Sequence, residues 1–119
     1  MKNVFSVLVV LALFIIPVVV FAGEGPLPLP SGANPEANKH NVEGIASWNQ
    51  KDYKGALMHF SAASKIDGSS GEIHFNEAIC YDKIGQHGVA TKHFGVALKK
   101  AGGNEKLLNS PILKGHLGM

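Results

Sequence analysis

Small and aromatic residues recur along the middle of the chain at the spacing of an α-helix. Ala56, Phe60 and Ala63 stand at positions i, i+4 and i+7, which lie on one face of a helix. The same triplet returns further along the chain as Ala90, Phe94 and Ala97. Alanine lets two helices approach closely, and phenylalanine fills the space between them. This pattern predicts packed helices and no strand, so the expected fold class is all-α.

Polar residues indicate where these helices begin. Asn34 before Pro35 is typical of an N-cap followed by the first helical residue. Asp52, and either Ser69 or Ser70, precede the next helical segments in the same way. The short turns between the segments favour two antiparallel hairpins. The helices are expected over about residues 35–50, 53–66, 72–84 and 87–100.

The chain repeats itself after 34 residues. Residues 38–68 aligned with residues 72–102 share nine identities, which is well above chance. These identities include the small and aromatic positions that two packed helices need. The identical pairs are His40/His74, Glu43/Glu77, Ile45/Ile79, Ala56/Ala90, His59/His93, Phe60/Phe94, Ala63/Ala97, Lys65/Lys99 and Gly68/Gly102.

Residues 51–67, KDYKGALMHFSAASKID, resemble the second-helix signature of the tetratricopeptide repeat (TPR) family. The resemblance divides the middle of the chain into two repeats, residues 37–70 and 71–104. It implies a TPR-like superhelix in which the first helix of each hairpin lines a concave groove. His40 and His74 depart from the family, which usually has a large apolar residue at their position.

The same resemblance implies which side chains face the groove. Trp48, Phe75 and Ile79 would form an apolar floor, and Asn41 and Asn76 would bond the backbone of a bound peptide. Tryptophan is enriched at binding hot spots, but a single tryptophan in a small domain is also common in the core, so both places stay open for Trp48. The expected partner-binding residues are Asn41, Ile45, Trp48, Phe75, Asn76, Ile79 and Lys83.

Residues 105–119 have an apolar face and resemble the terminal helix that caps such arrays. Pro111 predicts a kink or a restart in this capping helix, with Ser110 as a new N-cap. Two repeats are fewer than the three or so that stacking normally requires. The open ends of the array are therefore expected to be buried by self-association or by a larger partner.

Residues 1–22 have the composition of a secretory signal peptide. A lysine precedes an apolar run, and the run ends in Val20-Phe21-Ala22, with small residues at positions −3 and −1 of a cleavage site. Cleavage after Ala22 would release an exported protein into a periplasm or an equivalent compartment. A retained membrane anchor is the alternative, because the run approaches the roughly 20 residues that span a bilayer.

Residues 23–34 form a Pro-rich arm, GEGPLPLPSGAN, in which three prolines alternate with Leu27 and Leu29. Each proline fixes φ and removes a backbone donor, so the arm is expected to be extended. One interpretation is a spacer between the leader and the helical domain. The other is a docking arm whose Leu27 and Leu29 fit a groove on a neighbouring molecule.

Composition argues against several classes of function. The 119-residue chain has a formal net charge of +2, no block of like charges and no arginine, so nucleic acid is not an expected partner. A single cysteine, Cys80, excludes an internal disulfide and a multi-cysteine zinc site. The sequence contains no phosphate loop, no paired carboxylates and no nucleophile beside a base. It is therefore not expected to be an enzyme.

Six histidines raise the question of metal or haem binding. None belongs to a Cys-x-x-Cys-His or His-Glu-x-x-His motif. His40 and His74 are equivalent in the repeat, as are His59 and His93. Equivalent residues of adjacent repeats stand about a helix-pair width apart, which is too far for one ion. The sequence therefore predicts no metal and no cofactor.

These observations predict an exported, non-enzymatic protein–protein interaction module of TPR type. Its role would be that of a small scaffold or assembly subunit in a larger periplasmic complex, with self-assembly through the arm as one form of that role. One alternative is a metal- or haem-associated redox accessory protein that uses the histidines. Another is a membrane-anchored docking factor that retains residues 1–22.

Overall fold

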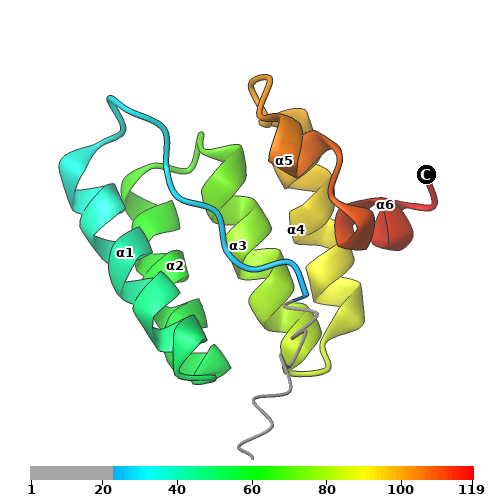
Figure 1. Ribbon diagram of the computed structural model, residues 1–119, viewed down its shortest axis with the longest axis horizontal. Helices are drawn as coiled ribbons and strands as arrows, with labels where there is room; N and C mark the ends of the chain where they lie inside the picture. Colours follow the sequence, from blue (N-terminus) through cyan, green and yellow to red (C-terminus); the bar gives the residue numbers. More distant parts are fainter. Residues whose placement is uncertain (1–22) are drawn as a thin grey trace, which may run out of the picture.

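The computed structural model describes residues 23–119, and this part of the chain contains helices and no strands. The helices are α1 (Pro35–Asn49), α2 (Tyr53–Ile66), α3 (Gly71–Lys83), α4 (His87–Lys99), α5 (Glu105–Leu108) and α6 (Pro111–Leu117). α1 packs on α2 and α3 packs on α4 as two antiparallel hairpins, and α2 joins the hairpins through α3 (Figure 1). The predicted all-α fold with two hairpins is confirmed.

Three of the four hairpin helices begin at a side-chain cap. Asn34 accepts hydrogen bonds from two backbone N–H groups in the first turn of α1, at 2.9 and 3.0 Å. Asp52 accepts one from α2 at 2.9 Å, and Ser70 accepts one from α3 at 3.1 Å. Such caps satisfy N–H groups that have no partner within the helix. At α4 the cap position is Gln86, whose side chain makes no capping bond.

Phe60 and Phe94 fill the two hairpins at equivalent positions, and both are fully buried. Gly44 of α1 lies directly against Phe60, because a β-carbon added at this glycine would lie 2.5 Å from a ring carbon. In the second hairpin the equivalent residue is Ala78, which is also buried. There Phe94 packs edge-on against Phe75, with 5.6 Å between the ring centroids. The first hairpin therefore requires glycine where the second accommodates alanine.

Pro111 restarts the carboxyl-terminal helix and does not bend it. The segment forms two separate helices, α5 and α6, with a break at Asn109 and Ser110. Ser110 accepts a hydrogen bond from the N–H of Leu113 at 3.1 Å, and Pro111 occupies the first turn of α6. A proline at this position costs little, because its missing N–H would have no partner within the helix. α6 then packs on α4 as the predicted cap.

The predicted signal segment, residues 1–22, lies outside the described residues. Among the helices of residues 23–119, none combines the length and the apolar character that crossing a membrane requires. The arm of residues 23–34 is described in full. It runs from beside α3 to the start of α1 (Figure 1).

Gly44→Ala should destabilise the first hairpin by about 1–3 kcal/mol, because the new methyl group overlaps the buried ring of Phe60. Gly95→Ala in α4 is the matched control, since the β-carbon position of this glycine has no neighbour within 4 Å. The control should stabilise the chain by up to about 1 kcal/mol through helix propensity. Urea unfolding followed by circular dichroism measures both changes, and equal stabilisation by the two substitutions would contradict the packing of Gly44.

Candidate functional site

The arm of residues 23–34 lies along the face that α1 and α3 form (Figure 1). These are the first helices of the two hairpins, so this face corresponds to the groove that the sequence predicts as a binding surface. Both helices contribute hydrogen bonds to the arm. An extended segment of the same chain therefore occupies the groove.

Two fully buried asparagines hold the backbone of Leu27. The N–H of Leu27 donates to Oδ1 of Asn76 at 2.7 Å, and Nδ2 of Asn76 donates to the carbonyl of Leu27 at 2.9 Å. Nδ2 of Asn41 donates to the same carbonyl at 3.1 Å, and Oδ1 of Asn41 accepts a bond from Asn76 at 2.8 Å. The amide of Asn76 thus pairs with both polar groups of one residue, as a neighbouring β-strand does. The groove therefore binds the main chain of the arm directly.

The leucines of the arm add their side chains to the core. Leu27 is 8% exposed and belongs to the cluster that contains Phe75 and Phe94. Burial of one leucine side chain contributes about 1.5–3 kcal/mol to stability. Leu29 is partly buried and packs against a second cluster, which consists of Ala37, Ala63 and Ile73.

Glu24 fastens the amino-terminal end of the arm to the carboxyl-terminal cap. Its Oε2 accepts a hydrogen bond from the backbone N–H of Ile112 at 2.7 Å. Ile112 lies in the first turn of α6, where backbone N–H groups have no partner within the helix. The negative carboxylate also complements the partial positive charge at this helix end. The arm therefore connects α1, α3 and α6.

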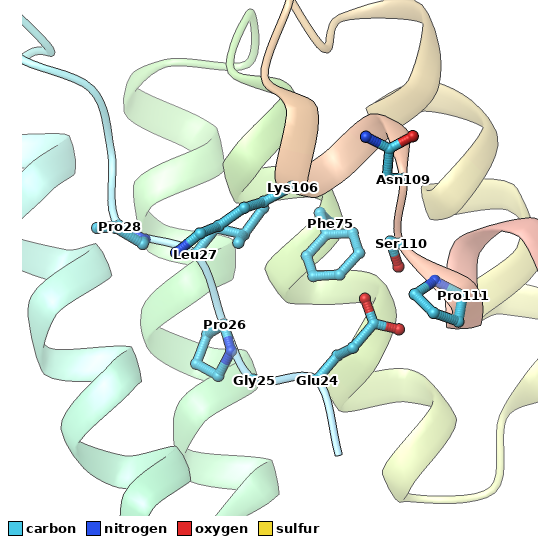
Figure 2. Close-up of a pocket in the computed structure, with 10 residues that line it drawn as sticks. All are labelled: Glu24, Gly25, Pro26, Leu27, Pro28, Phe75, Lys106, Asn109, Ser110 and Pro111. Atoms are coloured by element: carbon cyan, nitrogen blue, oxygen red, sulfur yellow. The ribbon is translucent and has the colours of Figure 1, made fainter. Parts of the chain in front are cut away.

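An open pocket of about 450 Å³ lies beside the arm (Figure 2). One wall is the arm itself, from Glu24 to Pro28, and the opposite wall includes Phe75 of α3 and Lys106 of α5. Figure 2 shows Glu24 and Leu27 on the arm, with the carboxylate of Glu24 directed toward Pro111. The pocket extends the groove from the arm toward the cap.

Three of the apolar residues expected in the groove lie at different depths. Phe75 and Ile79 are each 1% exposed and form part of the core beneath the arm. Ile45 is half-buried and packs against the cluster around Phe60. With the arm in place, Phe75 and Ile79 are therefore covered, and Ile45 keeps contact with solvent.

Trp48 lies between the core and the surface, so it takes part of both roles that the sequence left open. It is half-buried and packs against the cluster of Phe60. A β-carbon at Gly25 would lie 3.7 Å from Nε1 of Trp48, so the arm passes beside the indole. The indole meets the ring of Tyr53 with 4.8 Å between centroids. The ammonium of the exposed Lys83 lies 5.8 Å from the indole centre, which is a cation–π distance.

Cys80 is fully buried in the first hairpin's core cluster with Ala56 and Phe60. Burial, with a further contribution from the charge of Glu77, raises the pKa of the Cys80 thiol to about 12. A thiol with this pKa is protonated at neutral pH and is a poor nucleophile. In the described structure Cys80 therefore serves as a small apolar side chain.

Histidines and carboxylates gather in three groups that have metal-ligating chemistry. In one group Oδ1 of Asp82 accepts hydrogen bonds from His87 at 2.7 Å and His116 at 2.8 Å. Burial acts to raise the pKa of Asp82, but these two bonds and the charges of the two histidines together lower it. In another group burial raises the pKa of Glu77 and lowers that of His93. The groups are His40, Glu43 and His59; His74, Glu77 and His93; and Asp82, His87 and His116.

The chain is similar to a small part of a known protein, although no family profile matches it. A stretch of 64 residues is 39% identical to sperm-associated antigen 1 of Homo sapiens, a protein that contains tetratricopeptide repeats. The match covers 54% of this chain and 7% of the human protein. Together with the paired helices, this partial similarity supports a TPR-like helical module. Such a fold implies protein partners in general.

Asn76→Ala should release the arm while the helices stay folded. The substitution leaves the N–H of Leu27 without a partner, which costs about 1–3 kcal/mol. We expect the Leu27 amide to exchange with solvent at least about 10-fold faster, as measured by hydrogen exchange and NMR. Asn38→Ala, at an exposed position of α1, is the control and should leave this exchange unchanged. Unprotected exchange of Leu27 in the unsubstituted chain would contradict the placement of the arm.

Proposed function

We propose that this chain is an exported, non-enzymatic interaction module whose groove binds extended segments containing leucine and proline. The observation that carries the proposal is the pair of hydrogen bonds between Asn76 and the backbone of Leu27. Main-chain bonds do not depend on the side chains, so a groove that holds one extended segment accepts others of similar sequence. In this role the chain acts as a small scaffold or assembly subunit of a larger periplasmic complex.

The chain's own arm sets how strongly a partner must bind. A tethered segment acts at an effective concentration on the order of millimolar. An external segment displaces it only when its affinity is higher or when assembly raises its local concentration. Exchange of arms between two copies of the chain satisfies the same contacts and produces self-assembly. The arm thus blocks the groove of its own chain, and it can also join two copies of the chain.

The first hairpin offers a second surface for a partner. Within residues 23–119, α3 is the only helix beyond the hairpin itself that packs extensively on it, whereas α6 covers the outer end of the second hairpin. Val42 of α1 is 56% exposed and Met58 of α2 is 73% exposed. These exposed apolar side chains support burial of the first hairpin in a larger assembly.

Binding of the arm in trans tests the proposed function. A protein that lacks residues 23–31 is titrated with a fluorescent peptide of the sequence of those residues, GEGPLPLPS. We expect one peptide to bind per chain, and at least about 10-fold weaker binding to the mature chain, whose own arm competes. The matched control is a peptide with Leu27→Asp, which should not bind because it places a charge in the apolar cluster.

Circular dichroism must show that the truncated protein keeps the helical content of the mature chain. If the folded truncated protein fails to bind the arm peptide at millimolar concentration, the groove is not a recognition site for such segments, and the proposed function is wrong. Equal binding of the two peptides would also contradict the role assigned to Leu27.

Export is the second part of the proposal, and it is supported by the composition of residues 1–22. Expression with the native leader in a bacterial host, followed by mass spectrometry of the intact protein, tests it. We expect a periplasmic protein that begins at Gly23, after cleavage following Ala22. A membrane-bound protein that retains residues 1–22 would instead support the alternative of an anchored docking factor.

A further inference from the structure

Three buried side-chain atoms without a hydrogen-bond partner in the described part of the chain converge between α3 and α4. They are Nδ1 of His74, Oε1 of Glu77 and Nδ1 of His93. The two nitrogens lie 3.5 Å and 3.9 Å from the carboxylate oxygen. The side chain of Glu77 is only 6% exposed. Because buried polar atoms normally have partners, the convergence of these three points to a ligand that bonds all of them.

The outer nitrogen of His74 determines the chemistry of the inner one. Nε2 of His74 lies 2.9 Å from the carbonyl oxygen of Gly68. Because a carbonyl can only accept, Nε2 carries the proton, and in the neutral imidazole Nδ1 keeps a lone pair. This lone pair faces the carboxylate oxygen of Glu77, which is also an acceptor. A cation between them satisfies both.

The spacing of the three atoms suits an ion with tetrahedral coordination. Bonds of about 2.0–2.1 Å at tetrahedral angles place ligand atoms about 3.3 Å apart. The distances of 3.5 and 3.9 Å are slightly longer, and each of the three residues offers one ligand atom within 4.8 Å of the other two. Small side-chain rotations bring them to the spacing of a bound ion.

The surroundings orient these side chains as the outer contacts of metal sites do. Oε2 of Glu77 accepts a hydrogen bond from the hydroxyl of Ser61 at 3.3 Å, and the carbonyl of Gly68 holds His74. Contacts of this kind fix the tautomer and the direction of metal ligands. A small pocket of about 100 Å³ opens onto the imidazoles of His74 and His93. Lys92 and Val96 complete its lining, and a water molecule entering from it would supply a further ligand.

The three equivalent residues of the first hairpin, two histidines and a glutamate, meet in the same way as His40, Glu43 and His59. Nδ1 of His59 lies 3.2 Å from Oε2 of Glu43, and Nδ1 of His40 is buried without a partner among residues 23–119. The side chains of His59 and Glu43 are 36% and 40% exposed, so water competes more strongly for them. We therefore expect the group in the first hairpin to bind an ion more weakly than the group in the second hairpin.

The third group consists of Asp82, His87 and His116. It differs from the other two because its polar atoms already have hydrogen-bond partners within the chain. Oδ1 of Asp82 accepts from both rings, and Nδ1 of His116 bonds with the hydroxyl of Thr91 at 2.8 Å. It ties α6 to α3 and α4 without an ion. It therefore supplies a control for the other two.

We propose that His74, Glu77 and His93 bind a divalent transition-metal ion of the Zn²⁺ class, with water as the fourth ligand. Two imidazoles and one carboxylate are a ligand set that zinc takes in proteins. The bound ion would join α3 to α4 and stabilise the second hairpin by mass action. This site uses none of the groove contacts, so a test of the metal site is independent of a test of the proposed function.

Titration of the mature chain with ZnCl₂ tests the site, with protein that carries no polyhistidine tag. We expect one tightly bound equivalent of Zn²⁺ and a Tm that rises with zinc concentration. His93→Gln and Glu77→Gln change side-chain size little, and each should weaken the tight site by at least about 10-fold and abolish most of the rise in Tm. His87→Gln, in the third group, is the matched control and should bind zinc as the unsubstituted chain does.

NMR of the imidazole nitrogens gives a readout that does not depend on stability. Zinc should shift the Nδ1 resonance of His74 and leave its Nε2 protonated. The proposal is overturned if the unsubstituted chain binds no zinc, or if Glu77→Gln and His93→Gln bind it as tightly as His87→Gln does. A His74 ring protonated on both nitrogens at neutral pH, and unchanged by zinc, would show that the group is an ion pair instead.

Discussion

The buried amides of Asn41 and Asn76 require a peptide backbone between the first helices of the two hairpins. They bond to each other at 2.8 Å, and their remaining partners are the N–H and carbonyl of Leu27. Without that backbone, these two side chains would have to exchange their bonds to Leu27 for bonds to water. The groove is therefore suited to bind an extended segment, and the function of the chain depends on which segment binds there.

This constraint explains how so short an array forms a core. The arm adds Leu27 to the main cluster and Leu29 to a second one, so it enlarges the apolar core of the two hairpins. Glu24 extends the connection to α6 through Ile112. The second hairpin, the arm and the cap share one continuous cluster. A partner that displaces the arm must replace these contacts.

Local signals in the sequence were sufficient for the helices, because the caps at Asn34 and Asp52 and the Phe60 and Phe94 periodicity act over a few residues. The occupant of the groove depends on contacts between Leu27 and Asn76, 49 residues apart, and an extended arm has no periodicity that reveals its place. The self-alignment compares residues one repeat apart and therefore misses His93 beside His74, which the hairpin brings together. In both repeats a glutamate follows a histidine by three residues, as in His74 and Glu77, and this recurrence was the signal in the sequence that could have indicated the histidine–glutamate group.

The central claim is that the arm occupies the groove of its own chain. Nuclear Overhauser spectra of a mixture of isotope-labelled and unlabelled chains of residues 23–119 test it most directly. We expect cross-peaks between the methyl groups of Leu27 and the ring of Phe75 that arise within one chain. Their relative intensity should stay the same when the protein is diluted. Absence of these cross-peaks, with Leu27 methyl shifts typical of an unfolded chain, would contradict it.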